Sequence, residues 1–183
     1  MTQKIKKNLR LILLSFILIF ISVYSSYYTG FSWIKGSLSD FGLISEFFNV
    51  SLIISGIALG IFTLLVIDKE HSQGLCRLFL LFSSLFLTFI GIFTKDYLIH
   101  FIFAIFFFIT FPFGLYFLGN NLYKSNPELG IVTKIVAASL IIIWALFFII
   151  WMLVFRFGLA IPEIITLSIC MIWVFYFIYK FKR

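Results

Sequence analysis

Long apolar runs separated by short polar breaks constrain this chain more than any other feature. A helix that crosses a bilayer needs about 20 mainly apolar residues. The 183-residue chain contains six such runs, at residues 11–31, 47–67, 78–94, 97–118, 135–155 and 161–179. Membrane strands alternate apolar and polar residues, whereas these runs are apolar throughout. The sequence therefore predicts an all-α polytopic membrane protein, a bundle of six transmembrane helices.

The composition excludes the common classes of water-soluble protein. Hydrophobic residues make up 63% of the chain and charged residues 11%, against about 45–50% and about 25% in soluble domains. No segment between the runs is long enough for a separate folded domain, so residues 1–183 are predicted to form a single integral membrane domain. The first run exceeds the roughly 7–15 residues of a signal-peptide core, and we expect it to remain as an anchor.

The distribution of lysine and arginine predicts the orientation. Cytoplasmic loops of membrane proteins carry an excess of these residues. With the N-terminus inside, only Lys35, Lys95 and Arg156 fall on the outer side. The inner side holds eleven basic residues: Lys4, Lys6, Lys7, Arg10, Lys69, Arg77, Lys124, Lys134, Lys180, Lys182 and Arg183. The sequence therefore predicts a cell-membrane protein with both termini in the cytoplasm. Basic residues placed this way do not indicate a nucleic-acid partner.

Small residues on the second and third runs indicate close helix packing. Gly56 and Gly60 form a small-xxx-small pair, which lets two helix backbones approach each other. Ser84, Thr88 and Gly91 form a similar stripe on the third run. We expect these faces to pack against each other within the molecule. The alternative is that they form an interface between two copies of the chain.

Polar residues gather at the expected outer ends of the runs. This group comprises Ser39, Asp40, Asn49, Lys95, Asp96, His100, Arg156 and Glu163. A helix rises about 1.5 Å per residue, so Asn49, His100 and Glu163 lie only about 3–5 Å below the starts of their helices. Because ionisable groups within membrane helices usually face the bundle interior, the sequence predicts an outward-opening polar pocket between the second, fourth and sixth helices.

Three groups of short motifs lie near the same ends. They are Ser39-Asp40-Phe41-Gly42 with Phe48-Asn49 and Gly56; Gly91-Ile92-Phe93 with His100 and Ala104; and Gly158-Leu159-Ala160-Ile161-Pro162-Glu163 with Trp173. Over about residues 11–180 they resemble an uncharacterised prokaryotic six-helix membrane family, domain of unknown function nine-hundred-ninety-eight. Thr94 departs from its pattern, because typical members have proline there. The resemblance implies no established activity. The Ser-Asp-x-Gly loop is distantly similar to that of Frag1/DRAM-like membrane proteins, some of which are linked to remodelling of lipid anchors.

One hypothesis for the outer group is an enzyme that acts on a lipid or lipid-linked head group from the outer leaflet. His100 would be the general acid or base, with Asp40 and Glu163 orienting it or exchanging protons. Asp96 lies four residues before His100 on the same helix face and is a further candidate to orient the imidazole.

The other members of the group would bind the substrate. Lys95 and Arg156 would hold a phosphate, Asn49 would line the pocket, and Ser39 would be a candidate nucleophile.

Two alternatives stay open, and the sequence does not decide whether the protein is an enzyme. One is a small-solute or proton-coupled transporter in which His100 and Glu163 titrate. The other is a non-catalytic membrane scaffold whose polar residues connect the outer loops. No cofactor or metal is predicted, because a single histidine in the runs provides neither paired haem ligands nor a zinc motif. Membrane lipid is the expected partner, and the sequence identifies no protein partner.

Overall fold

In the computed structural model, the described residues are 3–27, 31–66, 74–154 and 158–180. Every regular element among them is helical, which confirms the all-α polytopic prediction. The elements are α1 (Gln3–Tyr27), the short 3-10 turn η1 (Leu38–Asp40), α2 (Phe41–Ile44), α3 (Glu46–Val66), α4 (Gly74–Ile92), α5 (Leu98–Ser125), α6 (Pro127–Val154) and α7 (Ala160–Lys180). Helices α3 to α7 are long and apolar enough to cross a membrane. The described apolar part of α1 covers only Arg10–Tyr24, so a sixth span stays a prediction.

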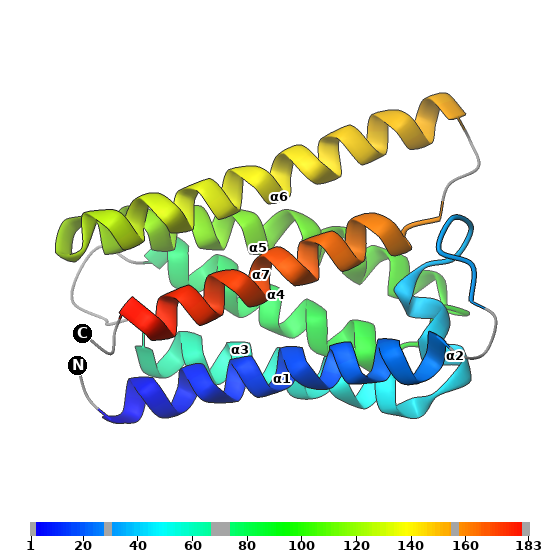
Figure 1. The fold of residues 1–183 in the computed structure, drawn as a ribbon, viewed down its shortest axis with the longest axis horizontal. Helices are drawn as coiled ribbons and strands as arrows, with labels where there is room; N and C mark the ends of the chain where they lie inside the picture. Colours follow the sequence, from blue (N-terminus) through cyan, green and yellow to red (C-terminus); the bar gives the residue numbers. More distant parts are fainter. Residues whose placement is uncertain (1–2, 28–30, 67–73, 155–157, 181–183) are drawn as a thin grey trace.

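The six long helices of the described residues alternate in direction (Figure 1), and their contacts close a ring. Each packs on the next, from α1 through α3, α4, α5, α6 and α7 and back to α1. η1 and α2 lie at one end of the ring, where they contact α1, α3 and α7. We call this the η1 end. Helix α1 begins and α7 ends at the opposite end (Figure 1); which end faces the cytoplasm stays a prediction.

The largest difference from the predicted boundaries lies at residues 119–134, which the sequence pattern indicates as a loop. Helix α5 instead continues to Ser125 and α6 begins at Pro127, so only Asn126 separates them. The Asn126 side-chain oxygen accepts a hydrogen bond from the Leu129 N–H at 3.1 Å. Proline is favoured at the first helical position, and Glu128 in the first turn suits the helix dipole. Hydropathy marks where the apolar surface ends, whereas capping groups mark where the helix begins.

Helices α3 and α4 pack through the predicted small residues. A Cβ atom on Gly56 would lie 2.7 Å from the Thr88 nitrogen and 2.8 Å from the Ser84 carbonyl oxygen. A Cβ on Gly60 would lie 2.8 Å from the Ser84 hydroxyl. These distances leave no room for a side chain, which confirms that this face packs within the molecule.

Gly56→Ile is therefore expected to destabilise the bundle. The added side chain must push α3 and α4 apart, and overpacking of this kind costs about 1–3 kcal/mol. Thermal unfolding in detergent measures the effect. Ala145→Ile is the control, because Ala145 is exposed on α6. Equal melting temperatures for the two variants would show that Gly56 tolerates a side chain.

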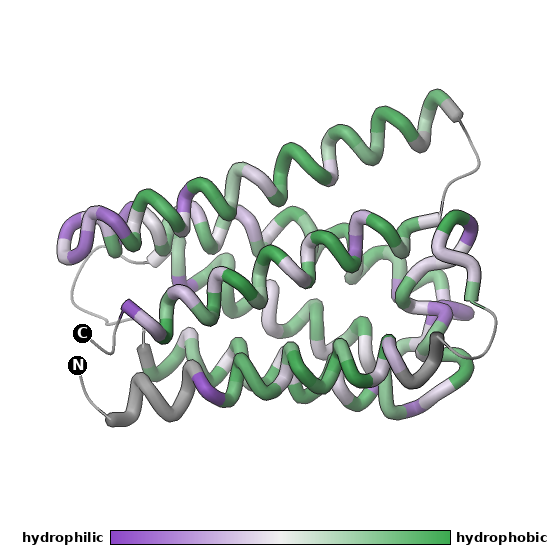
Figure 2. Tube along the Cα trace, in the orientation of Figure 1, coloured by the Kyte–Doolittle hydropathy of each residue, from purple (hydrophilic) through white to green (hydrophobic). Residues whose placement is uncertain are grey.

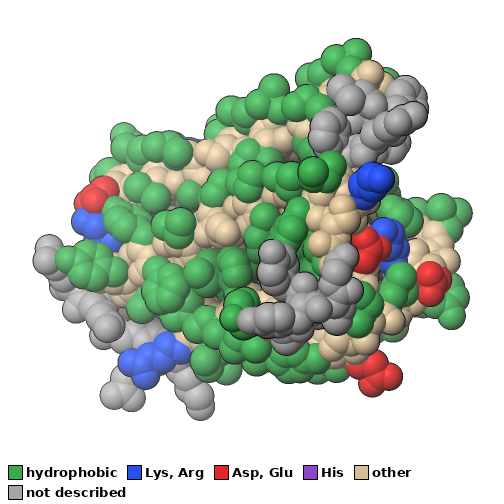
Figure 3. All heavy atoms as spheres, turned by 45° about the vertical axis from the view of Figure 1, so that its right-hand side comes forward, with side chains coloured by type: hydrophobic (Ala, Val, Ile, Leu, Met, Phe, Trp, Pro, Cys, Tyr) green, Lys and Arg blue, Asp and Glu red, His purple; other side chains and the backbone are tan. Residues whose placement is uncertain are grey.

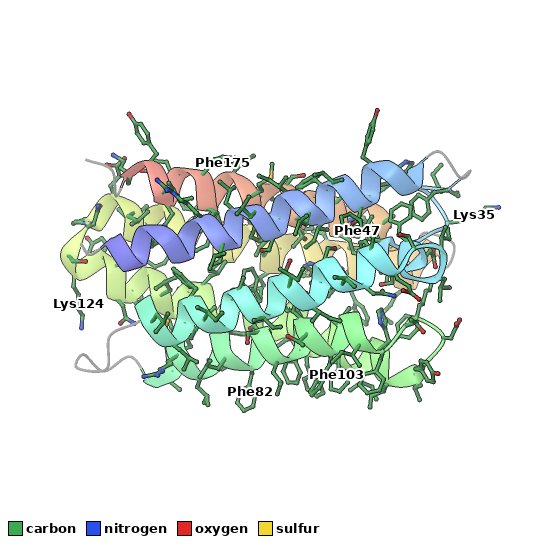
Figure 4. All side chains as sticks on the ribbon, turned by 90° about the horizontal axis from the view of Figure 1, so that it is seen from below. Lys35, Phe47, Phe82, Phe103, Lys124 and Phe175 are labelled. Atoms are coloured by element: carbon green, nitrogen blue, oxygen red, sulfur yellow. The ribbon has the colours of Figure 1, made fainter. Side chains whose placement is uncertain are left out.

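The surface of the bundle suits a lipid environment. The residues are mainly apolar over the middle of the long helices and more polar at both ends (Figure 2). Charged side chains accordingly gather at the ends of the molecule (Figure 3). Lys35 and Lys124 lie at opposite ends, while Phe82 and Phe103 lie along the outer side of α4 and α5 (Figure 4). An apolar band between two polar rims is the surface expected of a protein that spans a bilayer.

Candidate functional site

An aromatic anchor fixes the segment that carries the site at the η1 end. Phe41 follows η1 and has no exposed surface. Its ring lies 4.2 Å from that of Phe31 and 6.0 Å from that of Phe48, measured between centroids. The Asn49 side-chain amide donates to the Gly42 carbonyl oxygen at 2.8 Å. Asn49, a predicted substrate-binding residue, therefore ties α2 to α3.

Backbone pairing with the start of α7 fixes the other side of this segment. The Gly158 N–H donates to the Ile34 carbonyl oxygen at 2.6 Å, and the Ala160 N–H donates to the Gly36 carbonyl oxygen at 3.0 Å. A Cβ atom on Gly158 would lie 1.9 Å from the Gly36 oxygen. Only glycine allows these two backbone segments to approach this closely.

Ser39 and His100 form the central contact of the site. The Ser39 hydroxyl lies 2.9 Å from His100 Nε2, and His100 Nδ1 lies 2.7 Å from the Phe93 carbonyl oxygen. Because a carbonyl oxygen only accepts hydrogen bonds, Nδ1 must carry a proton. In the neutral imidazole Nε2 is then an acceptor, and the Ser39 hydroxyl donates to it. His100 is buried, with 3% of its surface exposed.

Asp40 and Lys95 form an ion pair beside this contact. Asp40 Oδ1 contacts the Lys95 ammonium, while Oδ2 accepts a hydrogen bond from the Ser37 N–H at 2.7 Å. The two charges neutralise each other, and both side chains are partly exposed, Lys95 at 29% and Asp40 at 26%. The contacts of Asp40 thus organise η1, and the imidazole of His100 is held by Phe93 and Ser39 instead.

Glu163 reaches η1 from the first turn of α7. Its Oε2 accepts a hydrogen bond from the Leu38 N–H at 2.6 Å, across 125 residues of sequence. His100 and Glu163 therefore contact consecutive residues of the same turn, Ser39 and Leu38. The structure thus brings together the histidine, one of the two predicted carboxylates and the predicted nucleophile.

The remaining predicted residues do not join this arrangement. Asp96 is exposed, and the group that orients the imidazole is the Phe93 carbonyl rather than the Asp96 carboxylate. Arg156 lies outside the described residues. Among residues 3–27, 31–66, 74–154 and 158–180, no three histidine, cysteine or acidic side chains are grouped closely enough to hold a metal ion.

An internal cavity of about 130 Å³ extends from this site along the axis of the ring. Ser39 and Glu163 line one end of it. The rest of its wall is mainly apolar and reaches Leu118 on α5 and Val174 on α7. From Glu163 to Val174 the helix rise of about 1.5 Å per residue gives a length of about 16 Å. Among the described residues that line the cavity, Glu163 is the only one with an acidic or basic side chain. Sequence patterns did not predict the cavity, because it depends on how the helices pack.

The hydroxyl groups deeper in the cavity are already hydrogen-bonded. Ser15 donates to the Ile12 carbonyl oxygen and Ser55 to the Ser51 carbonyl oxygen, each at 2.7 Å. The first bond lies within α1 and the second within α3. The polar character of the cavity is therefore concentrated at its η1 end.

Trp144 of α6 covers the wall between α5 and α7. Its ring centroid lies 3.8 Å from that of Phe108, and its Nε1–H donates to the Thr166 hydroxyl at 3.1 Å. Phe108 and Thr166 both line the cavity. Toward its C-terminal end at Val154, α6 diverges from α5 and α7 (Figure 1). Its apolar side chains are exposed there, up to 77% for Leu153.

Comparison with known proteins gives a family match and no characterised relative. The family model described as "Protein of unknown function (DUF998)" matches residues 12–179. Neither the curated proteins nor the solved structures contain a match to the chain.

Proposed function

The chain belongs to the DUF998 family of proteins of unknown function, and we propose that it binds and acts on a lipid through a single narrow apolar chain. That chain would occupy the internal cavity, and the polar end of the lipid would lie between Ser39, His100 and Glu163. The observation that carries this proposal is the cavity itself, which begins at Ser39 and Glu163 and continues into an apolar interior.

The size of the cavity favours a narrow ligand. Its volume of about 130 Å³ resembles that of an apolar cavity of about 150 Å³ that binds benzene. Pockets for drug-sized molecules have about 300–1,000 Å³. One alkyl chain lying along the axis fits this shape better than a two-chain lipid does.

The polar end of the site must provide the selectivity. A lipid chain that moves from the bilayer into an apolar cavity exchanges one apolar environment for another, so it gains little from the hydrophobic effect. Glu163 is the only acidic or basic residue among the described lining residues, and Lys95 is paired with Asp40. Among its described residues, the site therefore offers a hydrogen-bond acceptor and no unpaired lysine. This favours a ligand whose polar end donates hydrogen bonds, such as a hydroxyl or ammonium group, and disfavours a phosphate.

The divergence of α6 provides a route of entry. Helices α5 and α7 both pack on α6, so the wall between them is least covered where α6 moves away. That part of the wall lies toward the η1 end, where α5 and α7 begin, and His100 and Glu163 are in the first turns of these two helices. A lipid would enter sideways from the bilayer, with its polar end already at the level of Glu163.

Filling the cavity tests this proposal. Ala104 lines the cavity, so Ala104→Trp is expected to reduce the lipid that co-purifies with the protein at least tenfold. Mass spectrometry of the purified protein in mild detergent measures the lipid. Ala145→Trp is the matched control, because Ala145 is exposed on α6. The same mixed membrane lipids in the wild type and both variants, at unchanged melting temperature, would contradict lipid binding in the cavity.

A non-catalytic scaffold is the second candidate. It is favoured by the hydrogen bonds from the Leu38 N–H to the Glu163 side chain and from the Asn49 amide to the Gly42 carbonyl oxygen, which connect the η1 segment to α7 and α3. Such bonds stabilise the fold without any ligand. A scaffold would carry no selected lipid, so the same measurement separates the two functions.

A further inference from the structure

We propose that Ser39 and His100 form a nucleophile–base pair that cleaves or transfers the acyl group of an ester lipid held in the cavity. This inference rests on the proposed lipid binding and adds the reaction and the class of substrate. It follows from the hydrogen bonds at His100 together with the place of Ser39 at the end of the cavity.

The three groups have the arrangement that activates a serine. A nucleophilic serine needs a base within about 2.6–3.2 Å of its hydroxyl, and the base needs a third group that orients it. Ser39 lies 2.9 Å from His100 Nε2, and the Phe93 carbonyl oxygen lies 2.7 Å from Nδ1. The carbonyl fixes the tautomer that leaves Nε2 free to accept a proton, the role that an aspartate has in serine proteases.

Ser39 differs in this respect from the other hydroxyl groups of the cavity. Ser15 and Ser55 donate to carbonyl oxygens of their own helices. Ser39 instead donates to a buried imidazole and lines the cavity where the apolar wall begins. An ester group between an apolar chain and a polar end would lie at this level.

The reaction proceeds in two balanced steps. Ser39 Oγ attacks the ester carbonyl carbon and forms a bond to it, while His100 Nε2 takes the hydroxyl proton. The bond from the carbonyl carbon to the alcohol oxygen then breaks, and the alcohol leaves with the proton from Nε2. Water, or the hydroxyl of a second lipid, next attacks acyl-Ser39 and gives its proton to Nε2. The bond to Oγ breaks, and Ser39 recovers its proton.

A long-chain alkyl fluorophosphonate is the probe for this pair. Ser39 Oγ would displace fluoride at phosphorus, and the fluoride and the serine proton would leave as hydrogen fluoride. Intact mass spectrometry of the full chain in detergent should show one adduct, which peptide mapping places on Ser39. Ser39→Ala should give no adduct. Ser139→Ala, which alters a hydroxyl of α6 that does not line the cavity, should react at the wild-type rate.

His100→Gln tests the base. Glutamine can still donate to the Phe93 carbonyl oxygen and accept from Ser39, but it cannot take a proton at neutral pH. General-base catalysis contributes about 10²–10⁴-fold, so labelling should slow by at least 100-fold while the melting temperature stays the same. The inference would be overturned if His100→Gln were labelled at the wild-type rate. It would also be overturned if Ser39→Ala formed any adduct.

The co-purified lipid distinguishes failure of this inference from failure of the proposed function. If the wild type retains a selected single-chain lipid and forms no adduct, lipid binding stands and the serine reaction is wrong. If the wild type neither retains a selected lipid nor forms an adduct, both are wrong. A selected lipid and an adduct confined to Ser39 would support both.

Discussion

Gly158→Val is expected to separate the η1 segment from α7 and to lower the melting temperature by roughly 10 °C. A Cβ atom at this position would lie 1.9 Å from the Gly36 oxygen and 2.4 Å from the Lys35 carbonyl carbon. Both are backbone atoms, so no side-chain rotation relieves the overlap. The overlap and the loss of two hydrogen bonds together cost about 3–5 kcal/mol, and each kcal/mol lowers the melting temperature of a chain this size by about 2–4 °C.

Gly74→Val is the matched control for this variant. A Cβ on Gly74, at the start of α4, would meet no atom within 4 Å. Thermal unfolding in detergent compares the two substitutions. Fluorophosphonate labelling provides a second measurement, because the segment displaced by Gly158→Val carries Ser39. Equal stability and equal labelling of the two variants would show that the pairing of residues 34–36 with 158–160 is needed neither for the stability of the fold nor for the position of Ser39.

The apolar runs predicted where the long helices lie, because hydropathy reports contact with lipid. They did not predict where the helices end. The run at 97–118 stops seven residues before Ser125, since α5 continues past the apolar region into residues that can face water. The signal that locates the next helix start is local: Asn126 caps it, and Pro127 with Glu128 suits its first turn.

The sequence predicted the level along the bundle at which the site residues lie, but it did not predict their hydrogen-bond partners. His100 and Glu163 both lie in the first turn of a helix, and the fixed helix rise places them at one level. Their partners are the Phe93 carbonyl oxygen and the Leu38 N–H, which are backbone groups that no residue pattern identifies. The path of η1 decides these contacts, and that path depends on the close approach of Gly36 to Gly158, far apart in the sequence.

Glu163→Leu is expected to lose both the bound lipid and part of the stability of the η1 end. The Leu38 N–H would lose its acceptor, and an unpaired buried N–H costs about 1–3 kcal/mol. A ligand hydroxyl or ammonium would lose its hydrogen-bond acceptor, and a buried donor left without a partner costs about 1–3 kcal/mol. Since about 1.4 kcal/mol corresponds to a factor of ten, the retained lipid should fall about tenfold. Mass spectrometry of the co-purified lipid and thermal unfolding measure the two effects.

Glu163→Gln separates the ability of this side chain to ionise from its hydrogen bond. Glutamine still accepts from the Leu38 N–H, so the fold should hold, but unlike a carboxyl group it cannot become negatively charged to pair with a cation. A ligand with a hydroxyl end should be retained by this variant, whereas a ligand with an ammonium end should be lost. Glu128→Leu is the control: that carboxylate is 61% exposed near the opposite end of the bundle, where it pairs with Lys180, so the bound lipid should not change. Retention of the wild-type lipid by Glu163→Leu would contradict the assignment, because the only acidic or basic side chain among the described residues lining the cavity would then contribute nothing to binding.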